Sequence, residues 1–200
     1  MRPRLYIMAK APIMGHAKTR LAADIGRVHA KRHYRAMMGT LLCHMRDPRW
    51  NTVLMITPTH RLGQVPDWDG FVQIPQVRGS LSPKLAQVFS HHGPTIVIGT
   101  DSPQIRAGDI AAGFKALRRH EAVFGPASDG GFWLMGAKGP LPEAVFENVR
   151  WSSQHTLSDM EAHFGRAARL RTLTDIDDKA ALNSYQRSWY RSLYSPAQQS

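Results

Sequence analysis

Cysteine, long apolar runs and the common phosphate- and metal-binding motifs are scarce or absent in this sequence. Its single cysteine, Cys43, cannot form an internal disulfide, and one thiol excludes a cysteine-rich metal site. Cys43 lies in the apolar and basic stretch MMGTLLCHMR, which is typical of one helix face, so we expect a small buried side chain.

No run of about 18 apolar residues is present, so we expect no membrane span. The first residues lead into a strand-like segment without the apolar region of a signal peptide. These two absences predict a soluble, cytoplasmic protein.

Three short motifs are also missing. The ten histidines show no HExxH spacing, which excludes that common zinc site. Neither GxxxxGK[ST] nor GxGxxG occurs, so the sequence supports neither an ordinary P-loop nor a dinucleotide-binding fold.

Acidic residues are fewer than basic ones. The sequence contains 15 Asp and Glu and 26 Lys and Arg, which gives a formal net charge of +11. The cations are dispersed, and their densest groups, at 27–35 and 187–192, contain no motif of a named nucleic-acid-binding module. We interpret them as solvated helix faces with a general attraction for small anions, and we expect no nucleic-acid partner.

The length of 200 residues and the hydrophobic content of 42% suit one packed core. We therefore expect a single domain over residues 1–192. The polar residues 193–200 are expected to form a flexible tail.

Apolar runs and helical spacings alternate along most of the chain. Strands are expected at 5–9, 52–57, 71–75, 94–103 (with its closing turn), 122–127, 131–137 and 169–174. Helices are expected at 27–46, 82–92 (with Pro83 at its first position), 107–119, 151–164 and 177–189. The first of these helices carries an apolar stripe of Val28, Tyr34, Met37, Met38, Leu41, Leu42 and Met45. The alternation predicts an α/β domain, and the strand pair at 122–137 predicts that its mainly parallel sheet is mixed.

Polar clusters follow several of the expected strands, where open α/β sheets bind ligands. In the stretch MAKAPIMGHAKTRL, Gly15 allows close backbone approach, and Lys18 and Arg20 are cations suited to a pyrophosphate. A surface turn with solvated cations is the alternative interpretation of this loop. Asp101, in VIGTDSP, is placed to hold a divalent cation that also contacts phosphates, although helix capping would also explain it.

Further candidates lie in the second half of the chain. Asp129, ahead of two glycines in GPASDGGF, is either a carboxylate presented to an acceptor or part of a hairpin turn. Trp151 and Ser152 precede the expected helix at 151–164. Either Asp175 or Asp177 could complete a metal site with Asp101, and helix capping explains both equally well.

Taken in order, MAKAPIMGHAKTRL, VIGTDSPQI, FGPASDGGFWLMG, RWSSQ and LTDIDD resemble the DUF2064 family of bacterial proteins of glycosyltransferase A type, relatives of the phospholactate guanylyltransferases. The resemblance covers about residues 4–182. It implies the nucleotide-diphospho-sugar transferase (GT-A) fold, a three-layer α/β/α sandwich with a mixed, mainly parallel sheet.

The resemblance also implies roles for individual residues. Asp101 would hold Mg²⁺ or Mn²⁺ and take part in catalysis, Asp177 would be a second metal ligand, and Asp129 of the DGG motif would be catalytic. The residues expected to bind the nucleotide are Ala9, Pro12, Gly15, Lys18, Thr19 and Arg20. Those expected on the acceptor side are Gly130, Gly131, Trp151 and Ser152.

The function expected first is therefore a metal-dependent glycosyltransferase that uses a nucleotide sugar and a small acceptor, with Asp129 as the base if the reaction inverts. The alternative is a nucleotidyltransferase that joins an NTP to a phosphorylated or carboxylated metabolite and releases pyrophosphate, which the basic first loop favours. A third possibility is a non-catalytic nucleotide-binding module.

Overall fold

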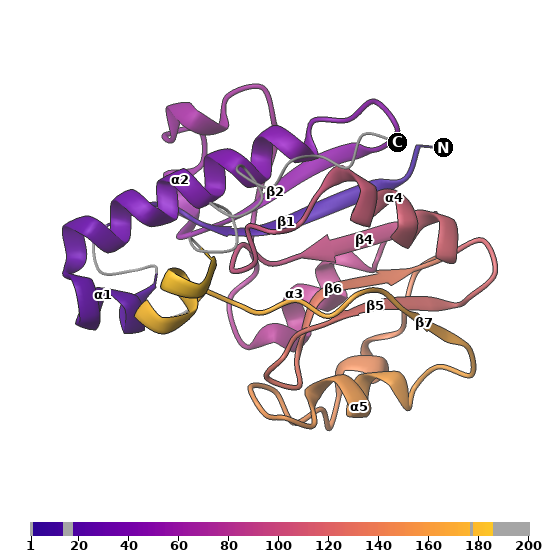
Figure 1. Ribbon diagram of the computed structural model, residues 1–200. Coiled ribbons are helices and arrows are strands. Elements are labelled where there is room, and N and C mark those ends of the chain that lie inside the picture. Colours follow the sequence, from indigo (N-terminus) through magenta and orange to yellow (C-terminus); the bar gives the residue numbers. More distant parts are fainter. Residues whose placement is uncertain (1, 14–17, 177, 186–200) are drawn as a thin grey trace, which may run out of the picture.

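A seven-stranded sheet in the order β3-β2-β1-β4-β6-β5-β7 forms the centre of the computed structural model (Figure 1), which describes residues 2–13, 18–176 and 178–185. The strands are β1 (Arg4–Lys10), β2 (Asn51–Thr57), β3 (Val72–Pro75), β4 (Thr95–Ile98), β5 (Ala122–Pro126), β6 (Phe132–Ala137) and β7 (Ala167–Arg169). Among these strands only β6 runs against its neighbours, since it pairs antiparallel with both β4 and β5. The predicted mixed, mainly parallel sheet is confirmed.

Helices cover both faces of the sheet. They are α1 (Thr19–Ile25), α2 (Arg27–Met45), α3 (Leu81–Val88), α4 (Ala107–Ala116) and α5 (Thr156–Glu161), with 3₁₀ turns η1 (Thr59–Arg61), η2 (Pro66–Trp68) and η3 (Glu143–Phe146). Residues 179–185 are also helical and pack beside α1, where Leu182 shares a small core with Leu21 (Figure 1).

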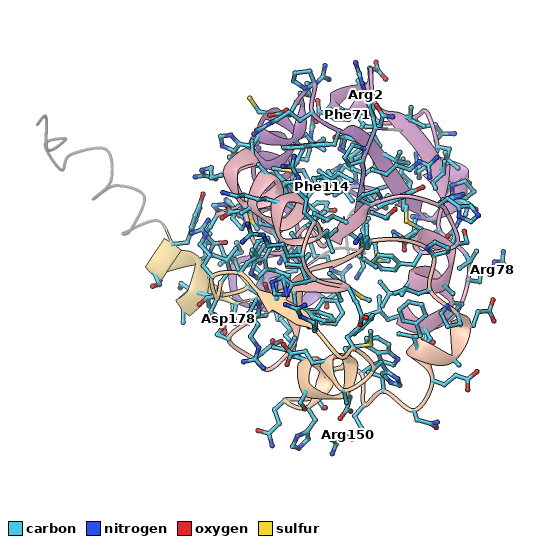
Figure 2. All side chains as sticks on the ribbon, turned by 90° about the vertical axis from the view of Figure 1, so that its right-hand side faces the viewer. Arg2, Phe71, Arg78, Phe114, Arg150 and Asp178 are labelled. Carbon is cyan, nitrogen blue, oxygen red and sulfur yellow. The ribbon has the colours of Figure 1, made fainter. Side chains whose placement is uncertain are left out.

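Alternate residues of each central strand enter two different cores, as the period of two in a strand requires. Leu5 and Ile7 of β1 pack with α2 and α4, whereas Tyr6 packs with α3, η3 and α5. Side chains fill the spaces on both sides of the sheet (Figure 2). The α/β/α sandwich implied by the resemblance is therefore the architecture of this chain.

The predicted long helix is confirmed, but the predicted burial is wrong for two of its side chains. α2 spans Arg27–Met45, and every residue of the predicted stripe is buried except Val28, which is 52% exposed. Val28 shares its helix face with Lys31, Arg32 and Arg35, which follow it by three, four and seven residues.

Cys43 is exposed, so its predicted burial is wrong. It lies on the face of α2 that also carries Gly39 and Thr40, four and three residues earlier, and both of these are exposed as well.

Several predicted boundaries move in the structure. Pro83 is the third residue of α3 rather than the first, because the helix already starts at Leu81. α5 begins only at Thr156. The last strand ends at Arg169, after which Leu173 makes a single bridge to Ala127. α1 was not predicted.

No helix among residues 2–13, 18–176 and 178–185 is both long and apolar enough to cross a membrane. The single domain over 1–192 stays a prediction, and the tail predicted at 193–200 lies outside the described residues.

Candidate active site

The carboxyl ends of the parallel strands surround a cavity of about 320 Å³. Lys10 ends β1 there, Thr57 ends β2, and the residues that follow β4 form a further wall. Open α/β sheets bind ligands in this position because loops and helix starts supply hydrogen-bond donors there. The polar side chains that line the cavity include those of Lys10, Lys18, Tyr34, Thr57, Lys84 and Asp101.

Lys18 and Asp101 form the charged centre of the cavity. Lys18 Nζ lies 2.5 Å from Asp101 Oδ1 and donates a hydrogen bond of 2.7 Å to the carbonyl oxygen of Ile176. The side chain of Lys18 is 2% exposed, whereas that of Asp101 is 50% exposed. The ammonium group therefore depends on its protein partners, while the carboxylate remains open to solvent and ligands.

The backbone of Lys18 is in the left-handed region, with φ 53° and ψ 51°. This conformation costs a non-glycine residue about 1 kcal/mol or more, and it is found preferentially at functional sites. It places Lys18 directly before α1, where its carbonyl oxygen accepts from Ala22 N at 2.8 Å. The buried contacts of its side chain offset the cost of this conformation.

Residues 170–176 run beside the residues that follow β4. Ile176 N donates to the carbonyl oxygen of Asp101 at 2.9 Å, and Ser102 Oγ donates to Asp175 Oδ1 at 2.5 Å. Gln104 Nε2 donates to the carbonyl oxygen of Thr174 at 3.0 Å. Asp175 is thus hydrogen-bonded to Ser102, the residue after Asp101, whereas Asp177 lies outside the described residues.

Arg171 and Asp109 attach this segment to the start of α4. Arg171 Nε and Nη2 donate to the two carboxylate oxygens of Asp109 at 2.7 and 2.8 Å, and Asp109 also accepts from Arg106 N at 2.8 Å. Burial raises the pKa of Asp109, but these hydrogen bonds outweigh burial and hold the pKa below its usual value.

The acid stability of the protein should depend on Asp109. A carboxylate with a lowered pKa in the folded state stabilises that state above the unfolded pKa of about 3.9, and this stability is lost as the pH falls through the lower, folded pKa. We expect Asp109→Asn to flatten the decline in the free energy of unfolding below about pH 4, as measured by urea unfolding. Asp67→Asn, which breaks the more exposed ion pair with Arg35, is the matched control and should change stability little. Equal acid profiles for wild type and Asp109→Asn would contradict this role.

Tyr34 joins α2 to the ends of β1 and β4. Its hydroxyl donates to the carbonyl oxygen of Lys10 at 2.7 Å and also interacts with Thr100. Burial, the largest effect, raises the pKa of Tyr34 to about 12, so the phenol is neutral at physiological pH. Tyr34 therefore orients the strand ends as a neutral hydrogen-bonding group.

Sequence reasoning missed Lys10, Tyr34 and Lys84. Lys10 directly follows an apolar run at the end of an expected strand, and that position was the available signal. Tyr34 and Lys84 come from α2 and α3, and no local pattern indicates that these helices reach the same cavity.

The DGG motif lies outside the lining of this cavity. Asp129 Oδ1 accepts from Gly131 N at 2.9 Å, which closes a turn between β5 and β6. Gly130 has φ +90°, and its carbonyl oxygen accepts from Leu157 N at 3.0 Å. The motif therefore attaches the hairpin to the start of α5.

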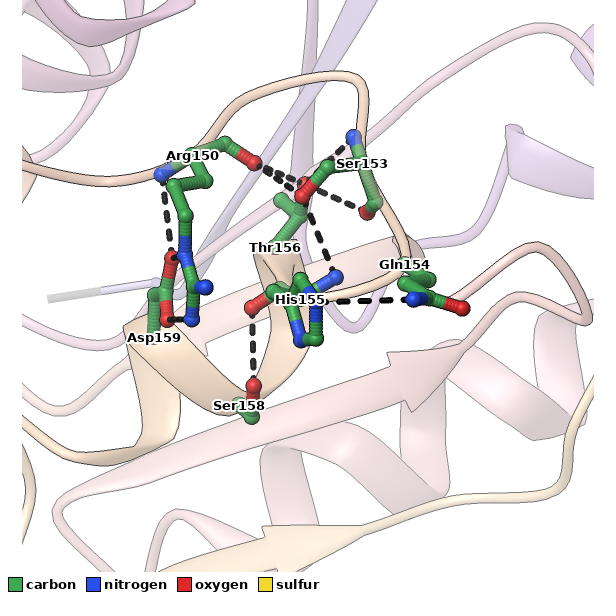
Figure 3. Close-up of polar contacts among 7 residues, drawn as sticks. All are labelled: Arg150, Ser153, Gln154, His155, Thr156, Ser158 and Asp159. Atoms are coloured by element: carbon green, nitrogen blue, oxygen red, sulfur yellow. Dashed lines mark hydrogen bonds and ion pairs between the residues drawn. The ribbon is translucent and has the colours of Figure 1, made fainter.

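Trp151 and Ser152 also lie outside the lining. Trp151 Nε1 donates to Ser82 Oγ of α3 at 2.8 Å, and Ser152 is in the left-handed region with φ 56°. The turn that contains them is closed by hydrogen bonds from Ser153 and Thr156 to the carbonyl oxygen of Arg150 and by the ion pair of Arg150 with Asp159 (Figure 3).

The other residues of the first loop are spread over different surroundings. Ala9 is fully buried in the core, and Pro12 lines a separate cavity with Arg35 and Asp67. Thr19 and Arg20 are exposed in the first turn of α1, and Gly15 lies outside the described residues. Among the expected nucleotide-binding residues that the structure describes, Lys18 is the one that lines the cavity.

The described residues offer limited ligands for a metal. They contain no group of three or more His, Cys, Asp or Glu side chains that could hold an ion, and Asp101 is the carboxylate in the described lining of the cavity. One open carboxylate fits Mg²⁺ or Mn²⁺ that takes its other ligands from phosphate oxygens and water. It does not fit an ion held by side chains alone.

Residues 41–153, more than half of the chain, match the family described as "Uncharacterized protein conserved in bacteria (DUF2064)". The matched part includes Asp101, the DGG motif, Trp151 and Ser152, and it excludes Lys18. No curated protein matches the chain.

Solved structures share the fold at low sequence identity. A Desulfovibrio desulfuricans G20 protein, provisionally described as a nucleotide-diphospho-sugar transferase, is 21% identical over 100% of this chain and 92% of its own, with a TM-score of 0.83. The 4-diphosphocytidyl-2C-methyl-D-erythritol synthase of Anaerococcus prevotii is 9% identical over 95% and 96%, with a TM-score of 0.66. Rv0371c of Mycobacterium tuberculosis, in complex with manganese, is 16% identical over 94% and 100%, with a TM-score of 0.55.

Proposed function

The chain belongs to the DUF2064 family, and on that premise we propose that it is a nucleotide-dependent transferase whose active site is the cavity at the carboxyl ends of β1, β2 and β4. The observation that carries the proposal is the Lys18–Asp101 pair, since it places a buried cation and an open carboxylate at the position where this sheet architecture binds ligands. The descriptions of the Desulfovibrio and Anaerococcus proteins support a nucleotide as the donor.

Two further lysines extend the positive charge of the cavity. Lys10 comes from the end of β1 and Lys84 from α3, so three lysines and one carboxylate line the same space. The remaining walls include apolar side chains such as Leu85 and Phe132. A nucleotide has both characters, because its phosphates need cations and its base and ribose can pack against an apolar wall.

Nucleotidyl transfer is the chemistry that these residues support best. An oxygen of the acceptor's phosphate or carboxylate forms a bond to the α-phosphorus of an NTP, the bond from that phosphorus to the bridging oxygen breaks, and pyrophosphate leaves. Lys10, Lys18 and Lys84 would stabilise the charge on the triphosphate. An ionised acceptor brings no proton to remove, which suits a cavity whose described lining holds no His and no carboxylate besides Asp101. Mg²⁺ or Mn²⁺, held by Asp101, would supply charge neutralisation at the phosphates.

Glycosyl transfer is the second candidate, and the description of the Desulfovibrio protein favours it. The acceptor hydroxyl oxygen would bond to the anomeric carbon, the nucleoside diphosphate would leave, and the hydroxyl proton would pass to a base, for which Asp129 is the sequence-based candidate. Asp129→Asn keeps an oxygen that can accept from Gly131 N but removes a base. Loss of turnover with unchanged stability in this variant would favour glycosyl transfer.

A thermal-shift titration tests the donor. The protein is heated with Mg²⁺ or Mn²⁺ and with NTPs or nucleotide sugars, because a ligand of the native state raises its stability by about 2.7 kcal/mol at a hundred times its Kd. We expect the largest rise in Tm with an NTP and metal. A rise confined to a nucleotide sugar would favour glycosyl transfer, binding without turnover would indicate a non-catalytic module, and no rise with any donor would overturn the proposal.

Lys84 should contribute directly to NTP affinity. We expect Lys84→Ala to weaken NTP binding about tenfold, since a charge-assisted contact contributes about 1.5 kcal/mol or more. Affinity is measured by isothermal titration. Arg166→Ala removes an exposed cation just before β7, the strand at the far edge of the sheet from β3. This variant should leave the affinity unchanged. Equal losses in both variants would mean that only the overall charge matters.

A further inference from the structure

A second cavity, of about 500 Å³, lies at the amino-terminal ends of the parallel strands, opposite the candidate active site. Pro3 precedes β1, Trp50 precedes β2 and Pro94 precedes β4, while the end of α4 closes one side. Phe114 of α4 lies on the face of the molecule that Figure 2 presents. This volume is within the range of small-molecule sites.

The floor of the cavity is aromatic and contains an unsatisfied donor. Trp50 is 3% exposed, and its ring lies 5.8 Å from that of Phe114 at an interplanar angle of 38°. Trp50 Nε1 is buried and has no hydrogen-bond partner among the described residues. A buried donor without an acceptor costs about 1–3 kcal/mol, and the residue that carries it lines this cavity.

The rim carries four cations from three separate parts of the chain: Arg49, Lys115, Arg118 and Lys138. The guanidinium of Arg49 lies 4.9 Å from the ring centre of Trp50 and pairs with Asp47 at 2.7 Å. The other three are exposed, and none of them forms an ion pair with another residue of the described ranges.

Helix-dipole stabilisation explains only part of this charge. Lys115 and Arg118 lie at the carboxyl end of α4, where a cation contributes about 0.3–1 kcal/mol. Lys138 directly follows β6 and Arg49 precedes β2, so neither belongs to that helix end. Cations from different elements converge on one apolar floor.

We propose that this second cavity binds a small anion that carries an aromatic ring, such as an aryl phosphate or carboxylate. The ring packs against Trp50 and Phe114, and the anionic group pairs with Lys115, Arg118 and Lys138. This site is separate from the candidate active site, since the two cavities share no lining residue.

The indole N–H resonance of Trp50 reports directly on this site. In a ¹H–¹⁵N correlation spectrum it is identified by its loss in Trp50→Phe. We expect it to shift on titration of the full chain with phenyl phosphate, and to shift less with inorganic phosphate, which lacks a ring. Benzoate and a nucleoside monophosphate distinguish carboxylate from phosphate and a plain ring from a nucleobase. An unmoved Trp50 resonance with all the aromatic anions would overturn the proposal.

Two neighbouring arginines provide the matched variants. Arg118 lines the cavity, whereas Arg119 is also exposed but does not line it. We expect Arg118→Glu to weaken phenyl phosphate binding at least about tenfold and Arg119→Glu to change it little. Lys84→Ala, in the candidate active site, should leave this binding unchanged, so failure here and failure of the proposed transferase function are separable. Equal effects of Arg118→Glu and Arg119→Glu would show a non-specific response to charge and contradict the proposal.

Discussion

Replacing Asp101 with asparagine is expected to lower the free energy of unfolding by about 3 kcal/mol, because it removes the carboxylate that pairs with the buried ammonium group of Lys18. The Lys18 side chain is 2% exposed, so water cannot take the place of the lost carboxylate, and the hydrogen bond to the carbonyl oxygen of Ile176 supplies no negative charge. Urea unfolding at neutral pH measures the change.

Lys18→Met is the matched variant, and it should cost much less. It leaves Asp101 unpaired, but that carboxylate is 50% exposed and can be solvated. Methionine also keeps an unbranched side chain at the left-handed position. The double variant Lys18→Met/Asp101→Asn should recover about 2 kcal/mol of the loss in Asp101→Asn, since no charge remains buried. Additive losses in the double variant would show that the two side chains do not interact.

The second large effect is expected at Gly130. A Cβ there would lie 2.4 Å from both the Cα and the carbonyl oxygen of Gln154, and the residue has φ +90°. The contact is with backbone, so no side-chain rotation relieves it, and the conformation itself is strained for an L-residue. We expect Gly130→Ala to lower the free energy of unfolding by at least about 3 kcal/mol, measured by urea unfolding.

Gly131→Ala tests the neighbouring glycine of the same motif. Its Cβ would meet Asp129 Oδ1 at 3.1 Å, an atom of a side chain that can shift, so we expect a loss of about 1 kcal/mol or less. Gly139→Ala, where a Cβ meets nothing within 4 Å, serves as the open control. If Gly130→Ala were as stable as Gly131→Ala, the close approach of the hairpin to Gln154 would be refuted.

The mainly parallel sheet and the long helix α2 could be predicted because their signals are local. A run such as TVLMIT is apolar and β-branched wherever it lies, and the apolar stripe of α2 repeats at helical spacing over 19 residues. α1 was missed because it is seven residues long and follows a lysine in the left-handed region, a helix start that no capping pattern indicates.

The candidate site was predictable only in part. Asp101 follows a clear buried strand, and Lys18 follows a loop rich in proline, glycine and basic residues, so both could be singled out locally. Their pairing could not, because Lys18 and Asp101 follow different strands, and no local pattern shows that β1 and β4 are neighbours in the sheet. Asp129 shows the converse, since its local pattern fits both a turn and a catalytic carboxylate, and the structure places it in a turn outside the cavity lining.

By itself, the sequence determined the α/β class, the strands and the residues that could carry charge at the strand ends, because periodicity and strand-end polarity are properties of neighbouring residues. Only the tertiary structure decided that Lys10, Lys18, Lys84 and Asp101 share one cavity while the DGG motif attaches a hairpin to α5. The physical reason is that a cavity is made by side chains from distant elements, and their meeting is set by sheet order and helix packing, which no local pattern encodes.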